Sequence, residues 1–148
     1  MPTNPEFPVS LLRLLAAAVI GGLVLCVSLP AEAGVVAQIN PSSQRMRVFV
    51  DGMLAHDWPV STAKPGYVTP RGSFRVGMMA ANGYSHKYRS PMPYAMFFRG
   101  SYAIHGTTHV GSLGRPASHG CVRLAPGNAR MLFRLAQARG GARVVIQD

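Results

Sequence analysis

Residues 118–124 read Ser-His-Gly-Cys-Val-Arg-Leu, and we expect the rest of the chain to be organised around them. The stretch carries Cys121, and a second histidine, His105, lies 16 residues upstream in the run Ile-His-Gly-Thr. The thiolate is the reactive form of cysteine, so a thiol needs a nearby base or a lowered pKa. The pattern predicts acyl transfer through a thioester, on a small β-rich scaffold that holds the two segments face to face.

Two histidines, His105 and His119, are candidates for the base that deprotonates Cys121. A catalytic imidazole is usually oriented by a third group. The carboxylates that follow residue 33 all lie far from the motif in sequence: Asp51, Asp57 and Asp148. We therefore predict that a backbone carbonyl orients His105. Gly120 allows close approach of the backbone and could present N–H groups to a developing oxyanion.

Two other interpretations of these residues stay open. A zinc site could use His105, His109, His119 and Cys121, although no pair among them has a strong zinc-binding spacing. Cys121 could also be a buried structural residue beside hydrogen-bonded histidines. The nucleophile interpretation predicts neither a metal nor a cofactor, and we expect the remaining histidines on the surface or in a flap: His56 and His86.

The first 33 residues have the pattern of a signal peptide. Arg13 precedes an almost entirely apolar run at residues 14–29, and Ala31-Glu32-Ala33 provides the small-x-small pattern that signal peptidase accepts. We expect cleavage after Ala33, export to the periplasm or cell envelope, and one domain at residues 34–148. The alternative is an uncleaved membrane anchor, although the apolar run is shorter than the roughly 20 residues that span a bilayer.

Charge and cysteine content narrow the function of residues 34–148. This part keeps 14 basic residues and three acidic ones, and the basic residues are scattered singly without an RNA-binding aromatic signature. We expect no nucleic-acid partner, and either a solvated basic surface or attraction to an acidic substrate. Removal of Cys26 with the signal peptide would leave Cys121 without a disulfide partner in the chain.

The scaffold is predicted to be mainly β. Apolar or alternating runs predict about seven short strands, at residues 35–39, 45–50, 53–59, 73–78, 92–98, 102–104 and 142–146. Asp51-Gly52 predicts a tight hairpin. Residues 80–91 lack periodicity and are expected to form a mobile flap, in which Tyr84, His86 and Tyr88 either touch a ligand or belong to an ordinary surface loop.

One helix is expected after Cys121. It starts at Pro126-Gly127-Asn128 and ends at Gly140-Gly141. Its apolar stripe is predicted to consist of four residues: Met131, Leu132, Leu135 and Ala136. The fold class is therefore a mainly β sandwich or barrel-like domain with one helix after the cysteine.

Nearly all of residues 34–148 resembles the catalytic domain of L,D-transpeptidases, the YkuD-like family. The resemblance is carried by residues 103–107, Ala-Ile-His-Gly-Thr, and 113–124, Leu-Gly-Arg-Pro-Ala-Ser-His-Gly-Cys-Val-Arg-Leu. Weaker similarity lies at residues 58–62, 69–72 and 92–94. The resemblance implies a β-sandwich-like fold with the cysteine under a flap.

The same resemblance implies roles for individual residues. Cys121 would be the nucleophile and His105 the general base. His119 and Gly120 would line the oxyanion site with the Cys121 N–H, and Ser118 would support the loop. Three further residues are implied in substrate binding: Arg123, Gly106 and Tyr94. Arg123 would bind a substrate carboxylate or brace the site, and many relatives carry asparagine at its position.

The implied reaction is peptidoglycan 3→3 cross-linking. The thiol would attack the carbonyl of the L-centred third residue of a tetrapeptide stem, release the terminal D-Ala, and pass the acyl group to an amine of another stem. Stem peptides would be donor and acceptor, a carbapenem could acylate the thiol, and the protein would be a monomer. Hydrolysis as an L,D-carboxypeptidase, exchange with a D-amino acid, or a non-catalytic wall-binding domain are the alternatives.

Overall fold

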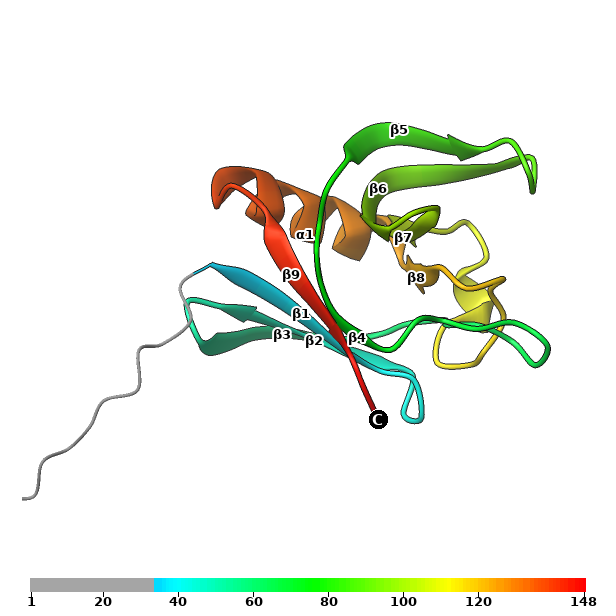
Figure 1. Ribbon diagram of the computed structural model, residues 1–148, viewed down its shortest axis with the longest axis horizontal. Helices are drawn as coiled ribbons and strands as arrows, with labels where there is room; N and C mark the ends of the chain where they lie inside the picture. Colours follow the sequence, from blue (N-terminus) through cyan, green and yellow to red (C-terminus); the bar gives the residue numbers. More distant parts are fainter. Residues whose placement is uncertain (1–33) are drawn as a thin grey trace, which may run out of the picture.

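Figure 1 presents a computed structural model of the protein, which describes residues 34–148. The predicted signal peptide at residues 1–33 lies outside the described residues, and its cleavage stays a prediction. Among residues 34–148, no helix has the length and apolar character needed to cross a membrane.

Two sheets and one helix form the domain, in agreement with the mainly β prediction. The larger sheet has the order β3-β2-β1-β9-β4 and is made of Val35–Asn40 (β1), Arg45–Val50 (β2), Met53–Pro59 (β3), Gly72–Arg75 (β4) and Ala142–Ile146 (β9). The smaller sheet has the order β5-β6-β7-β8 and is made of Met79–Ser85 (β5), Ser90–Arg99 (β6), Tyr102–Gly106 (β7) and Val122–Leu124 (β8). The helices are α1, at Pro126–Ala138, and a short 3-10 turn at Val110–Ser112.

The hairpin between β2 and β3 forms where Asp51-Gly52 predicts it. Both turn residues have positive φ, 50° for Asp51 and 80° for Gly52, as a two-residue hairpin turn with the correct twist requires. The Asp51 carboxylate accepts a hydrogen bond from the Gly34 N–H at 2.9 Å and pairs with Arg139 at the end of α1. The turn thus fastens the start of the domain to its helix.

The core lies between the two sheets and is closed by α1. Inward positions of β1 and β2 alternate with outward ones, so that Ala37, Ile39, Met46 and Val48 are fully buried. They pack in one cluster with residues of the smaller sheet and of α1, and α1 contacts β6 and β7. The smaller sheet is therefore held against the larger one by a continuous apolar layer. The other face of the smaller sheet contributes residues to a cavity.

The predicted apolar stripe of α1 is partly wrong. Leu132 and Ala136 are fully buried, but Met131 is 44% exposed, and Phe133 is buried in its stead. The buried set is Ala129, Leu132, Phe133 and Ala136, which follows the i, i+3, i+4, i+7 spacing of one helix face. The buried face begins at Ala129, two residues before the start of the predicted stripe.

Residues 80–91 are more regular than predicted. Strands β5 and β6 pair in antiparallel register, with Ser85 opposite Ser90 across a short turn. Figure 1 shows this hairpin projecting beyond α1, on the side of the molecule where residues 107–121 lead into β8. Residues 80–91 thus belong to a hairpin and not to an irregular surface loop, since pairing with β6 supplies the order that local periodicity lacks. The mobility of this flap stays a prediction.

The corrected helix face makes a stability prediction. Leu132→Ala should lower the free energy of unfolding by about 2–5 kcal/mol, because it leaves a cavity in the core. Met131→Ala, one residue earlier and largely exposed, should change it by about 0.5 kcal/mol or less. Denaturant unfolding of both variants measures the difference, and similar losses for the two would contradict the assigned face.

Candidate active site

The site is built on the parallel pair β7 and β8. Their register sets Ile104 opposite Val122 and His105 opposite Arg123. Because side chains alternate across a strand, Ile104 and Val122 enter the core while His105 and Arg123 face the other side. Cys121, two residues before Arg123, lies on that same side.

His105 is 6% exposed, and its Nδ1 lies 2.7 Å from the Gly106 carbonyl oxygen. With that oxygen as acceptor, Nδ1 carries the proton and Nε2 keeps its lone pair. The geometry agrees with the prediction that a backbone carbonyl orients this ring. Burial lowers the pKa of His105 below its ordinary 6.5, opposed by the Gly106 hydrogen bond and assisted by the charge of Arg123, so the ring is neutral at pH 7.

Cys121 is half-buried at the start of β8. Its thiol donates a hydrogen bond to the Ser101 carbonyl, with Sγ 3.8 Å from the oxygen. Burial raises the pKa of the Cys121 thiol above its ordinary 9.0, and the Ala103 N–H and the Arg123 charge oppose the rise. These shifts favour a neutral thiol beside a neutral imidazole, and such a thiol would need a base in order to act as a nucleophile.

The loop before Cys121 is held by side-chain hydroxyls. Ser118 Oγ accepts from the Gly120 N–H at 3.0 Å and donates to the Cys121 carbonyl at 2.6 Å. Thr69 Oγ1 donates to the Gly120 carbonyl at 2.9 Å and accepts from the Ala63 N–H at 3.0 Å. These bonds give Ser118 the geometry of a loop support, and they engage the Gly120 N–H that the sequence suggested for an oxyanion.

Gly120 is required by sterics. It has a φ of 129°, and a Cβ there would lie 2.5 Å from the Tyr102 ring and 2.8 Å from the Val68 carbonyl oxygen. Any other residue would clash with these atoms and strain the backbone. The sequence predicted that Gly120 allows a close approach of the backbone, and the groups approached are the Tyr102 ring and the Val68 carbonyl.

The loop is also braced from the side opposite β7. Ser61 and Arg123 exchange two backbone hydrogen bonds, and Lys64 N–H donates to the Ser118 carbonyl. The segment around residues 61–64 therefore fixes the loop and β8 against the larger sheet. The sequence predicted only a loop at these residues.

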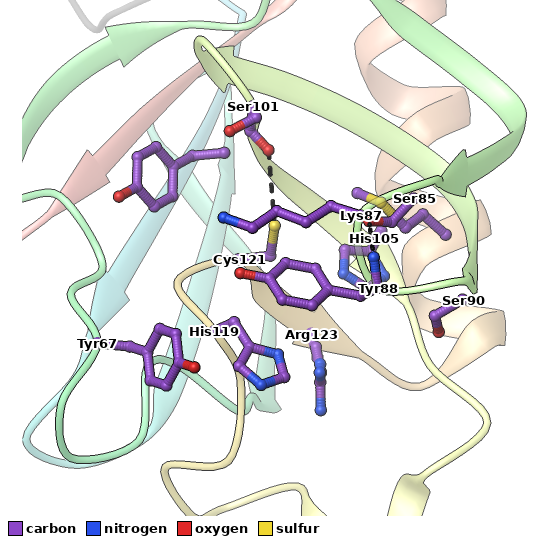
Figure 2. Close-up of a pocket in the computed structure, with 12 residues that line it drawn as sticks. Tyr67, Ser85, Lys87, Tyr88, Ser90, Ser101, His105, His119, Cys121 and Arg123 are labelled. Atoms are coloured by element: carbon purple, nitrogen blue, oxygen red, sulfur yellow. Dashed lines mark hydrogen bonds between the residues drawn. The ribbon is translucent and has the colours of Figure 1, made fainter.

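A cavity of about 260 Å³ opens over the thiol (Figure 2). Its walls come from the β5–β6 hairpin, the start of β7, residue 67 and the loop into β8, and its lining residues are Tyr67, Ser85, Lys87, Tyr88, Ser90, Met92, Ser101, Tyr102, His105, His119, Cys121 and Arg123. The structure thus brings Cys121, His105, His119 and Arg123 to one cavity, with the tip of the hairpin beside them.

His119 is engaged through its ring faces. Its ring stacks on Tyr88, with centroids 4.3 Å apart and planes 7° apart, and meets the edge of Tyr67 at 4.7 Å. The pKa of His119 is lowered, mainly by burial and to a lesser extent by the positive charges of Lys64, Arg123 and Lys87. Its surroundings therefore differ from those of His105, whose nitrogen is held by a carbonyl.

The cavity is cationic. Lys87 and Arg123 line it, and the lining contains no carboxylate. The three acidic side chains of residues 34–148 each pair with an arginine away from the cavity: Asp57 with Arg45, Asp148 with Arg71 and Asp51 with Arg139. The electrostatics favour an anionic ligand.

Other predicted residues lie outside the cavity lining. The Tyr94 ring packs edge-on against Phe133 of α1, with centroids 5.7 Å apart, and joins the core. The carbonyl of Gly106 accepts the hydrogen bond from His105. A side chain at Gly106 would meet Pro93 and Pro126. His56 stacks on Trp58, and Tyr84 contacts His86.

Metal binding finds no support in this part of the chain. Among residues 34–148 there is no group of three or more His, Cys, Asp or Glu side chains that could hold a metal ion. His109 is exposed in the loop after β7, where its N–H donates to Thr107 Oγ1. Although His105, His119 and Cys121 line one cavity, the four residues of the zinc alternative do not form such a group within residues 34–148.

Sequence reasoning missed several residues of the site. Tyr67 and Lys87 carry no motif, Thr69 was not singled out, and Ser101 contributes only its carbonyl. Tyr88 was one of three flap candidates, and the structure separates it from Tyr84 and His86. A weak signal existed for Thr69, because residues 69–72 share the family resemblance.

A family model of the L,D-transpeptidase catalytic domain matches residues 34–146. The chain belongs to this L,D-transpeptidase family. YqjB of Bacillus subtilis (strain 168), a candidate L,D-transpeptidase, is 30% identical over 124 residues, which cover 74% of this chain and 69% of YqjB.

Solved L,D-transpeptidases share the fold. An L,D-transpeptidase from Mycobacterium smegmatis is 26% identical with a TM-score of 0.70, over 78% of this chain and 59% of that one. The L,D-transpeptidase of Stackebrandtia nassauensis is 26% identical with a TM-score of 0.69, over 81% of this chain and 58% of that one. The chain thus spans less than two thirds of these solved proteins.

One L,D-transpeptidase structure contains a β-lactam. LdtMt1 in complex with imipenem is 24% identical with a TM-score of 0.69, over 77% of this chain and 59% of that one. At this identity the likeness shows the fold.

The neutral resting pair makes a prediction for pH. Alkylation of Cys121 by iodoacetamide follows the thiolate, whose fraction rises about tenfold per pH unit below the thiol pKa. Because burial raises that pKa, the rate should climb from neutral pH past pH 9.0 without a plateau. Stopped-time alkylation with mass detection measures it, and a plateau between pH 6 and 8 would instead indicate a thiolate–imidazolium pair.

Proposed function

We propose that the protein is an exported cysteine L,D-transpeptidase that acts on peptidoglycan stem peptides. The observation that carries the proposal is that one cavity is lined by both His105, on β7, and Cys121, directly before the parallel strand β8. Export is supported by the signal-peptide pattern of residues 1–33. The acidic stem peptides also suit a cavity that carries Lys87 and Arg123 without a carboxylate.

The first half-reaction forms a thioester. Cys121 Sγ attacks the carbonyl carbon of the L-centred third stem residue, and its proton passes to His105 Nε2. The bond to the D-Ala nitrogen breaks, and His105 returns the proton to that nitrogen as D-Ala leaves. We assign the Cys121 N–H to the oxyanion, because the Gly120 N–H is already bonded to Ser118.

The second half-reaction resolves the thioester. An amine of another stem attacks the same carbonyl, gives its proton to His105, and displaces the sulfur, which recovers a proton from the imidazole. Water in place of the amine gives a shortened tripeptide, and a free D-amino acid gives exchange. The acceptor therefore depends on how well the cavity excludes water.

Analysis of muropeptides tests the proposed reaction. Sacculi incubated with the purified protein should yield 3→3 cross-linked dimers, and Cys121→Ser should yield none, because the hydroxyl is a much weaker nucleophile at this site. Shortened tripeptides without dimers would change the assignment to an L,D-carboxypeptidase. Identical digests for wild type and Cys121→Ser, with sacculus binding retained, would favour a wall-binding domain.

The role of His105 is tested by acylation with imipenem, which is bound by the related LdtMt1. His105→Ala should slow formation of the Cys121 adduct by roughly 10²–10⁴, the usual effect of losing a general base. His109→Ala, an exposed histidine of the next loop, is the matched control and should react at the wild-type rate. Intact-mass spectrometry over time measures both.

Two results would count against this account. An unchanged rate for His105→Ala, with an unchanged thermal transition, would transfer the base role to His119. The absence of an imipenem adduct on the wild-type protein after long incubation would count against Cys121 as an acylated nucleophile.

A further inference from the structure

A row of rings crosses the mouth of the cavity. His119 lies between Tyr67, which meets its ring edge-on at 4.7 Å, and Tyr88, which stacks on it at 4.3 Å. Each tyrosine carries an ammonium over its ring, Lys64 at 5.4 Å and Lys87 at 5.3 Å. Figure 2 shows Tyr67 and Tyr88 on either side of His119, and all three residues line the cavity that contains the Cys121 thiol.

The row joins three segments that are distant in sequence. Tyr67 belongs to a loop that is fixed by backbone bonds, Tyr67 N–H to Lys64 carbonyl and Lys64 N–H to Ser118 carbonyl. His119 belongs to the hydroxyl-braced loop before Cys121. Tyr88 belongs to the tip of the β5–β6 hairpin. Two members of the row therefore sit on a fixed base, and the third is on a projecting tip.

The tip itself is held by few and mostly local contacts. Tyr88 N–H donates to Ser85 Oγ at 3.3 Å within the same turn, and the Tyr84 ring contacts His86 on the same hairpin. Residues 86–89 are exposed, and Tyr88 is 42% exposed. The stack of Tyr88 on His119 thus joins the tip to the loop that precedes Cys121.

We propose that Tyr88 and His119 are positioning residues whose stacked rings hold the hairpin tip over Cys121 and so select acyl donors by width. With the rings stacked, the cavity of about 260 Å³ admits a slender, extended acyl group. A bulky group reaches the sulfur only after the stack opens. The inference rests on the proposed function for its biological meaning, and it assigns His119 a role apart from proton transfer.

The geometry of His119 fits this role. The plane of its ring is at 7° to the Tyr88 ring and at 76° to the Tyr67 ring. The His119 ring therefore makes a stacked contact with Tyr88 and an edge-type contact with Tyr67. Offset stacks and edge-on contacts of this kind are favourable arrangements of aromatic rings. The ring of His105, in contrast, is oriented by a hydrogen bond to a carbonyl.

The test compares two reagents with one reactive group. Wild type and variants of the full protein are alkylated at Cys121 with iodoacetamide and with a pyrene-bearing iodoacetamide, and the ratio of the two rates is taken. The ratio cancels changes in thiol ionisation, because both reagents need the same thiolate. It also requires no transpeptidase activity, so failure of the proposed reaction would leave this reading intact.

Tyr88→Ala should raise the ratio of bulky to small reagent by about 2- to 10-fold, the range expected for the loss of one aromatic pair. His119→Ala should do the same, while Tyr88→Phe and His119→Phe keep a ring in the stack and should keep the wild-type ratio. Tyr84→Ala is the matched control, because it removes a tyrosine from the same hairpin that does not line the cavity.

Either of two results would overturn the proposal. One is an unchanged ratio in Tyr88→Ala, which would mean that the tip does not limit access. The other is an equal rise in Tyr84→Ala, which would indicate general loosening of the hairpin and no specific effect of the stack.

Discussion

The parallel pairing of β7 with β8 is the constraint on which the site depends. Parallel strands need a long connection, and residues 107–121 supply it with one 3-10 turn. In the resulting register Val122 enters the core, and Cys121 turns outward to the side of His105. A slip of one residue would exchange these faces and bury the sulfur in the apolar cluster, away from the imidazole.

Burial and charge then set the chemistry of the pair. Desolvation opposes charge on both groups, so the pKa of Cys121 is raised and the pKa of His105 is lowered. A neutral thiol is a weaker nucleophile than a thiolate, so Cys121 would need to lose its proton in order to attack a carbonyl. Each acidic side chain of residues 34–148 pairs with an arginine outside the cavity. The positive charges that line the cavity are therefore not neutralised by a carboxylate there, and they favour an acidic ligand.

The two sides of the cavity are held by different interactions. On the loop side, hydroxyl groups of Ser118 and Thr69 bind backbone atoms around Gly120, and such bonds are directional and short. On the hairpin side, the contact is a stack of rings between Tyr88 and His119. Cys121 thus follows a loop fixed by hydrogen bonds, while the hairpin beside it is joined to that loop by a contact between rings.

By itself the sequence determined the type of fold, and it led to a hypothesis for the reacting groups. Alternation along residues 45–50, the Asp51-Gly52 turn and the glycines after α1 are local signals, and each formed the predicted element. The Ser-His-Gly-Cys run and the lack of nearby carboxylates led to a thiol nucleophile and a carbonyl-oriented imidazole. Only the tertiary structure decided which face of α1 is buried, that residues 79–85 form a strand, and that Tyr67, Thr69 and Lys87 belong to the site. The buried face of α1 and the site residues depend on contacts between segments that are far apart in the chain, and the strand at residues 79–85 depends on pairing with its neighbour β6. Such contacts leave no periodic trace in the residues that make them.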